Sequence, residues 1–224
     1  MEKLDNFYRR FDGSYYLFIA IILAIGTVIT SIMLYIQVDP TFTIVSHYLS
    51  NLGSTPKGAQ DGKIYSSAIV FNTGFTILAI FRILVILFLA RYLQIKGSPH
   101  KLTRVWVILS FFSSSGSLIV AIVPYSVSLS IHMLGALILF VGSVFSGVMF
   151  IIVELKTPEI PRYLPLVISI NVIVYLIFAT LLIGEWMGFA PEESSVIWEW
   201  IAFLSSLLWL SVHGVYTYKN PVIT

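Results

Sequence analysis

Residues 105–153 read VWVILSFFSSSGSLIVAIVPYSVSLSIHMLGALILFVGSVFSGVMFIIV and contain no Asp, Glu, Lys or Arg. A hydrocarbon core about 30 Å thick is crossed by about 20 residues of α-helix, so these 49 residues are long enough for two membrane spans. The stretch PYSVS at residues 124–128 is the natural break, because proline and polar residues favour a turn. The sequence therefore predicts a helical hairpin within a bilayer.

The composition of the whole chain agrees with a membrane protein. Of its 224 residues, 58% are hydrophobic and 11% are charged, and the mean hydropathy is +0.92. Soluble domains carry about 25% charged residues and could not bury so much apolar surface. These values exclude a soluble enzyme and a disordered chain, and the net charge of +2 excludes a nucleic-acid-binding module. Because the chain has no cysteine, disulfides and thiolate chemistry are also excluded.

Further apolar stretches flank the hairpin on both sides. Together with it they predict six transmembrane helices at about residues 15–38, 64–95, 105–123, 129–153, 163–184 and 196–218. Helices are expected because open strands would leave backbone groups unpaired in lipid. The predicted fold is an all-α polytopic membrane protein, with residues 1–224 forming a single six-helix transmembrane domain.

The distribution of basic residues predicts the orientation of this domain. Lys57 and Lys63 lie in the first loop, whereas ten basic residues fall on the side that carries both termini. These ten are Lys3, Arg9, Arg10, Arg91, Lys96, Lys101, Arg104, Lys156, Arg162 and Lys219. Cytoplasmic loops carry an excess of Lys and Arg. We therefore expect a multi-pass protein of the cell membrane with both termini in the cytoplasm.

The first loop, residues 39–63, is the one long connection between predicted spans. Ile44, Tyr48, Leu49 and Leu52 follow a helical spacing, with polar residues between them. Gly53 suits a left-handed cap at the end of such a helix. We expect residues 43–52 to form a short amphipathic helix at the outer interface of the membrane.

Small residues recur at spacings that bring membrane helices together. Gly142 and Ser146, like Ser143 and Gly147, are four residues apart, and serines crowd one side of the preceding span. In lipid such residues allow close backbone approach and hydrogen bonds between helices. Tight packing within the bundle is the plain interpretation, a polar path lined by hydroxyls is the alternative, and a homo-oligomer could also use these faces.

The stretch SHYLSNLG at residues 46–53 resembles a family signature, His-Pro-(Ile/Val)-Ser-(Asp/Glu)-Leu-Gly. This signature belongs to the six-helix membrane family catalogued as domain of unknown function 998. The start of the second span at residues 71–74, the turn before His132 and the pair Trp198-Glu199 fit the same family. Two positions depart from the signature, since Tyr48 replaces the proline and Asn51 replaces the acid. The resemblance implies the six-helix fold and no particular activity.

Several polar residues are expected at one depth, in the outer third of the bundle. Each has an ordinary explanation, since an interfacial histidine is usually solvated and a buried asparagine usually bonds to a neighbouring backbone. Ionisable residues within a membrane nevertheless justify a functional hypothesis. Their common depth suggests an outer pocket that binds a ligand, with independent interfacial residues as the alternative. The residues of this predicted outer pocket are His47, Ser50, Asn51, Asn72, His132 and Glu199.

Arg82 is the one charged residue near the middle of a predicted span. A charge there costs about 2.5–3.5 kcal/mol on insertion scales. We expect its side chain to extend along the helix toward the headgroups near Arg91. Pairing inside the bundle and binding of an anionic lipid group are the alternatives.

Three functions fit these residues. The first is binding of a lipid or small amphiphile without catalysis. The second is an enzyme that modifies lipids at the outer leaflet, with His47 or His132 as general base and Glu199 as acid or metal ligand. The third is transport. The absence of a nucleophile motif such as Gly-x-Ser-x-Gly argues against the second, and the absence of a visible repeat argues against the third. We predict no cofactor and no metal site, and we expect membrane lipids as partners.

Overall fold

The computed structural model of the chain describes residues 6–8, 12–56 and 64–222. In this part of the chain, six helices are long and apolar enough to cross a membrane. They are α2 (Ser14–Tyr35), α3 (Ser66–Ile95), α4 (His100–Ile122), α5 (Leu129–Leu155), α6 (Tyr163–Trp186) and α7 (Val196–Lys219). A 3-10 helix, η1 (Leu49–Gly53), lies between α2 and α3. The predicted all-α polytopic fold is confirmed; Lys57 and Lys63 lie outside the described residues.

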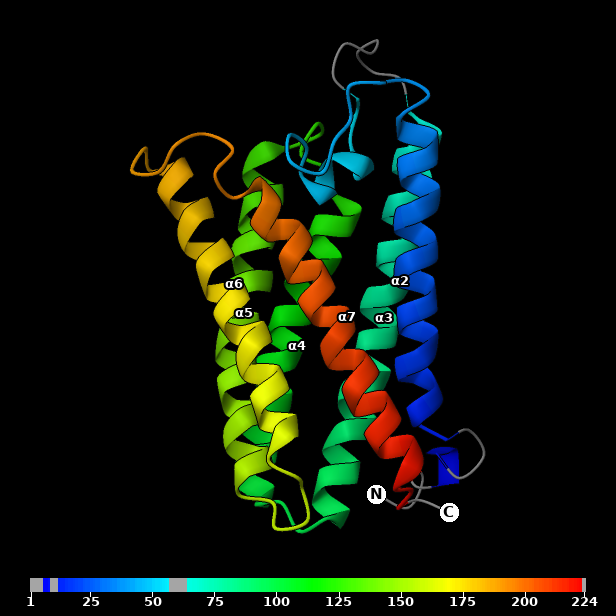
Figure 1. Cartoon of the computed structure of the whole chain (residues 1–224), viewed down its shortest axis with the longest axis vertical. Helices are drawn as coiled ribbons and strands as arrows, with labels where there is room; N and C mark the ends of the chain where they lie inside the picture. Colours follow the sequence, from blue (N-terminus) through cyan, green and yellow to red (C-terminus); the bar gives the residue numbers. More distant parts are fainter. Residues whose placement is uncertain (1–5, 9–11, 57–63, 223–224) are drawn as a thin grey trace.

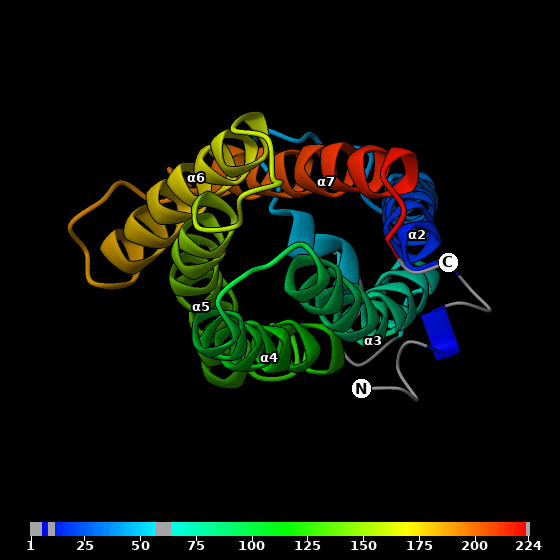
Figure 2. The ribbon, with the colours of Figure 1, turned by 90° about the horizontal axis from the view of Figure 1, so that it is seen from below.

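The six long helices form a ring. Each packs against the next one in sequence, and α7 returns to pack against α2. Seen along the helix axes, the six helices form a ring, and η1 lies within its outline (Figure 2). The start of α2 and the end of α7 lie at the end of the ring opposite η1 (Figure 1). We call these the η1 end and the terminal end.

The helix boundaries agree with the predicted spans to within a few residues, with one instructive exception. Helix α4 begins at His100, five residues before the apolar stretch, and includes Lys101 and Arg104. Pro99 precedes it, and the Thr103 hydroxyl donates a hydrogen bond of 3.2 Å to the Pro99 carbonyl. An apolar run locates the part of a helix that lies in lipid, whereas the helix itself continues through its basic flank.

The short amphipathic helix expected over residues 43–52 does not extend over that range. Turns occupy the first part of this segment, and only Leu49–Gly53 is helical. Side-chain bonds compete with helix formation here, because Thr43 and Ser46 bond to each other and the Thr43 N–H donates to Nδ1 of His47. Leu49 and Leu52 are buried as the pattern predicts, but Ile44 is 49% exposed.

The largest core lies at the terminal end of the ring. It is built from large side chains of α3, α5 and α6 that are almost completely buried, including Tyr92, Leu93, Phe150 and Leu164. A smaller core lies under η1, where Leu49 and Leu52 pack with Phe71 and Trp200. Between these two cores the ring is less densely filled.

The small residues bring α4 and α5 into close contact. A Cβ atom added to Gly116 of α4 would lie 2.3 Å from the backbone nitrogen of Leu139 in α5. Beside it, hydroxyls join across the interface at 2.6 Å between Ser110 and Ser146, and at 2.7 Å between the next serine pair, Ser113 and Ser143. These faces therefore pack within one chain, and a homo-oligomer would need a different surface.

The contact between α4 and α5 makes Gly116 intolerant of even a methyl group. We expect Gly116→Ala to lower the free energy of unfolding by about 1–3 kcal/mol, because the two backbones must separate. Gly26→Ala is the matched control, since a Cβ atom there meets no atom within 4 Å. That variant should gain about 0.5–1 kcal/mol from the better helix propensity of alanine. Thermal unfolding of both variants in detergent measures the difference, and equal effects would contradict this account.

Candidate functional site

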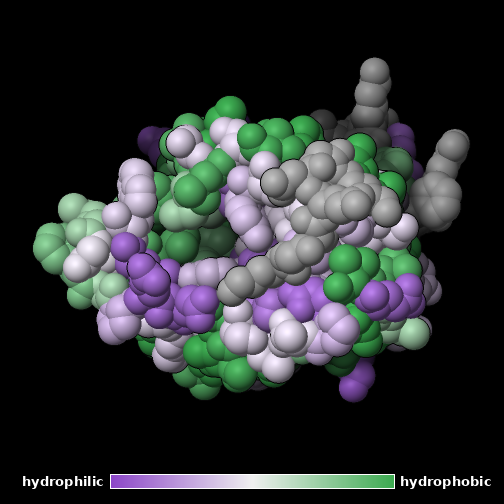
Figure 3. All heavy atoms as spheres, turned by 90° about the horizontal axis from the view of Figure 1, so that it is seen from above, coloured by the Kyte–Doolittle hydropathy of each residue, from purple (hydrophilic) through white to green (hydrophobic). Residues whose placement is uncertain are grey.

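A cavity of about 1000 Å³ occupies the centre of the helix ring. It extends from the η1 end, where Tyr48, Ser50 and Glu199 line it, toward the terminal end, where Arg82 and Trp209 line it. Viewed from the η1 end, polar side chains form a band across the face of the molecule, and a recess opens beside this band (Figure 3). Ligand sites in proteins have volumes of about 300–1000 Å³, so this cavity can hold a whole small molecule.

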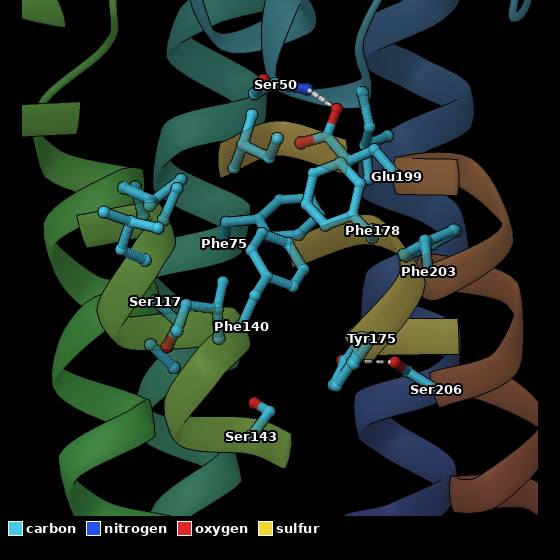
Figure 4. Close-up of a pocket in the computed structure, with 18 of the residues that line it drawn as sticks. Ser50, Phe75, Ser117, Phe140, Ser143, Tyr175, Phe178, Glu199, Phe203 and Ser206 are labelled. Carbon is cyan, nitrogen blue, oxygen red and sulfur yellow. Dashed lines mark hydrogen bonds between the residues drawn. The ribbon is translucent and has the colours of Figure 1, made fainter. Parts of the chain in front are cut away.

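Aromatic side chains from four helices line the middle of the cavity. Phe75 of α3, Phe140 of α5, Phe178 of α6 and Phe203 of α7 converge there, below Glu199 and above Ser143 (Figure 4). The rings of Phe140 and Phe178 meet edge to face with centroids 4.4 Å apart. This part of the cavity offers an apolar surface to whatever enters it.

An aromatic cluster ends the cavity toward the terminal end. Trp106 of α4 stacks on Phe150 of α5 with ring centroids 4.4 Å apart, and Trp209 of α7 meets the same phenylalanine at 5.9 Å. Phe150 is only 1% exposed and belongs to the largest core beyond it. The cavity therefore has a closed floor.

Arg82 points into the ring and does not follow the course expected from the sequence. Its Nη2 donates hydrogen bonds of 2.9 Å to Ser113 Oγ and 3.2 Å to Ser143 Oγ. The expectation that it extends toward the headgroups is wrong, because serines on α4 and α5 offer acceptors at its own depth. Of the alternatives raised by the sequence, pairing inside the bundle describes its position, with hydroxyls as the partners.

Glu199 and Asn72 hold the η1 segment in place. The N–H of Ser50 donates to Glu199 Oε2 at 3.3 Å, so the carboxylate meets the first turn of η1. Asn72 Nδ2 donates to the Gly53 carbonyl at 2.9 Å, at the last residue of η1. Gly53 permits this approach, since a Cβ atom on it would lie 2.4 Å from Asn72 Oδ1. These two predicted pocket residues thus fasten opposite ends of one short helix.

His47 faces away from the cavity. Its Nε2 lies 3.3 Å from Asp39 Oδ2, and its ring packs between Tyr35 and Phe42. A hydrogen bond from the Thr41 hydroxyl lowers the pKa of Asp39, so this carboxylate stays ionised beside the histidine. The expected direction of His47, toward the mouths of the neighbouring spans, is therefore wrong.

His132 and Asn51 lie on the cavity wall at the η1 end, as do Ser50 and Glu199. The Nδ1 atom of His132 bonds to the Val123 carbonyl at 2.8 Å, which ties the start of α5 to the end of α4. Within the described residues, no group of three or more His, Cys, Asp or Glu side chains is placed to hold a metal ion. Four of the six predicted residues therefore share the wall of one cavity, whereas Asn72 holds η1 and His47 pairs with Asp39.

A polar cluster at the η1 end was missed from the sequence. Glu185, the penultimate residue of α6, accepts hydrogen bonds from the Tyr48 hydroxyl at 2.7 Å and from the N–H and hydroxyl of Ser195, directly before α7. Burial raises the pKa of Tyr48, so its phenol remains protonated and can donate. The predicted fifth span ends at Gly184, and the acid that follows it directly, Glu185, was the available signal for this cluster.

A second missed pair joins α5 to α7 near the terminal end. Glu154 Oε1 lies 3.0 Å from His213 Nε2, and both residues are 2% exposed. The predicted fourth span ends one residue earlier, at Val153, and His213 was not singled out from the sequence. Nothing in the spacing of two residues 59 positions apart indicates that they meet.

The chain was compared with protein families, curated proteins and solved structures. No family model, no curated protein and no solved structure matches it. The resemblance to the six-helix family described above therefore stays a prediction, and the function must be argued from the geometry of the cavity.

The bond between Tyr48 and Glu185 joins the first loop to α6. We expect Tyr48→Phe to lower the free energy of unfolding by about 1.5–3 kcal/mol, the range for a hydrogen bond to a charged group. Tyr218→Phe is the control, because Tyr218 is 52% exposed. Chemical unfolding in a mild detergent measures both, and a Tyr48→Phe variant as stable as the control would refute the role given to this bond.

Proposed function

We propose that this multipass membrane protein binds a lipid or small amphiphile in its central cavity. The observation that carries the proposal is the cavity of about 1000 Å³, which is lined by residues of all six long apolar helices. Its middle is lined by phenylalanines, whereas polar side chains line both ends, Glu199 and His132 at the η1 end and Arg82, Ser143 and Ser206 deeper in the ring. A molecule with an apolar body and a polar part matches this division of surfaces, because apolar groups gain by burial and polar groups need partners.

The closed floor favours binding over passage through the membrane. Trp106, Phe150 and Trp209 occupy the end of the cavity, and the largest core continues beyond them. A transporter would have to open this core to release its cargo at the terminal end. We therefore place transport behind binding.

The same geometry gives less support to a lipid-modifying enzyme. His47 is engaged by Asp39 outside the cavity, and the Glu199 carboxylate accepts a bond from η1. A general base and a general acid must reach the substrate atoms between which protons move. His132 is the one histidine among the described residues that lines the cavity, and a catalytic partner for it is not among its hydrogen-bonded neighbours.

Filling the cavity tests the proposal. Ser117 lines the cavity and Ser115 is exposed on the same helix, and each hydroxyl bonds to a carbonyl three residues earlier. A brominated long-chain fatty acid and its methyl ester should quench the fluorescence of the wild-type protein in a saturable way, because Trp106 and Trp209 line the cavity. Ser117→Phe should weaken this binding about tenfold or more, and Ser115→Phe should leave it unchanged. Absence of saturable quenching, or equal binding by both variants, would overturn the proposal.

We further propose that the η1 end faces the outside of the cell. Basic residues of the described chain gather at the terminal end, among them Arg91, Lys96, Lys101, Lys156 and Lys219. The excess of positive charge there follows the rule for cytoplasmic loops. The cavity would then receive its ligand from the outer leaflet or the outer water phase.

Labelling of single cysteines tests this orientation cleanly, because the chain has no cysteine of its own. Pro191 between α6 and α7 and Pro158 between α5 and α6 are both exposed and lie at opposite ends of the ring. In intact cells, an impermeant maleimide should label Pro191→Cys and should label Pro158→Cys only after permeabilisation. The reverse pattern would invert the proposed topology.

A further inference from the structure

We propose that Arg82 binds the anionic group of the amphiphile held in the cavity. This inference rests on the proposed binding function and names the chemical class of the ligand. A carboxylate, sulfate or phosphate carried on an apolar body would pair with the guanidinium inside the ring. The apolar body would then lie along the phenylalanines toward the η1 end.

The first step is that Arg82 brings an uncompensated charge into the bundle. Its bonds are to two neutral hydroxyls, those of Ser113 and Ser143, and both come from a single nitrogen, Nη2. A guanidinium has five N–H donors in a planar fork that matches an anion with two oxygens. Among the described residues, no carboxylate forms an ion pair with it. Charges within membranes are normally paired, so an anion is the missing partner.

The second step is that the acidic groups of the cavity are engaged or distant. Three glutamates line it, and all three belong to its η1 end. Glu185 accepts from Tyr48 and Ser195, Glu199 accepts from Ser50, and Glu193 is exposed in the loop before α7. The deep part of the cavity therefore offers positive charge alone, which selects an anion over a cation or a neutral ligand.

The third step concerns the apolar body of the ligand. Arg82 lies 16 residues after the first residue of α3, which corresponds to about 24 Å of helix from the η1 end. The route between them passes Phe75, Phe140, Phe178 and Phe203 (Figure 4). A bare inorganic anion would lose its hydration on this apolar surface without gaining contacts. A long alkyl chain would gain by burial there, so an anionic amphiphile fits better than a free ion.

The experiment compares ligands of one length and different charge in the full-length protein. A brominated long-chain fatty acid, its methyl ester and the amine of the same chain length are titrated in a neutral detergent, with quenching of tryptophan fluorescence as the readout. We expect the wild-type protein to bind the acid at least tenfold more tightly than the ester or the amine. Acetate should not displace the acid, because it lacks the apolar body.

Substitution of Arg82 assigns this selectivity to one side chain. In Arg82→Gln the preference for the acid over the ester should fall about tenfold, with the affinity for the ester unchanged. Arg82→Lys should keep part of the preference, because the charge remains and the planar fork is lost. Arg104→Gln is the matched control, since it removes one arginine from an exposed position of α4 and should leave the preference intact.

Each outcome separates this inference from the proposed function. Equal binding of acid, ester and amine by the wild-type protein would overturn the anion site and leave the binding function standing. The same holds if Arg82→Gln lowers thermal stability but keeps the full preference for the acid, since Arg82 would then only join α3 to α4 and α5. Displacement by acetate at similar concentrations would show a site for small anions and overturn the amphiphile. Failure of all three probes to bind would overturn both proposals.

Discussion

The close contact between α4 and α5 is the interaction on which the rest of the structure depends. Gly116 lets the two backbones meet, and two pairs of serines bond across the interface. In lipid, where apolar contacts between helices gain nothing over contacts with lipid tails, such backbone approach and hydrogen bonding hold helices together. The same seam supplies Ser113 and Ser143 to Arg82. One contact therefore joins two of the six helices of the ring, and it also supplies hydrogen-bond acceptors to a charge inside it.

The ring closes where α7 packs against α2, and its centre is filled by other means. At the terminal end the filling is aromatic, and contacts of Phe150 with Trp209, like the pair of Glu154 and His213, connect α5 to α7 across the ring. At the η1 end the first loop does the filling, held by Glu199, Asn72 and Glu185. Between these two ends no segment of the described chain enters the ring, and the cavity remains.

The sequence predicted the fold well because lipid imposes strong rules on it. A span must be apolar, helical and about 20 residues long, and these properties can be read from a single stretch such as residues 105–153. The site was predicted only in part. Depth along a span can be counted from the sequence, and Ser50, Asn51, His132 and Glu199 line one cavity at the η1 end of the bundle. The direction of a side chain around its helix cannot be counted in the same way, which is why Arg82 and His47 were misplaced.

The residues that the sequence singled out at the η1 end are mostly occupied with one another, which changes where chemistry should be sought. A buried polar group needs hydrogen-bond partners, and Glu199, Asn72 and His47 each find one in a neighbouring group of the protein. A group that is left with unused donors therefore carries more information than a group that is merely polar. Arg82 is such a group. Its Nη2 donates hydrogen bonds to two serine hydroxyls, and its side chain, with the remaining N–H donors, lines the cavity. Arg82 carries the charge that costs most free energy to place in the membrane, and binding of the proposed anionic ligand would offset that cost.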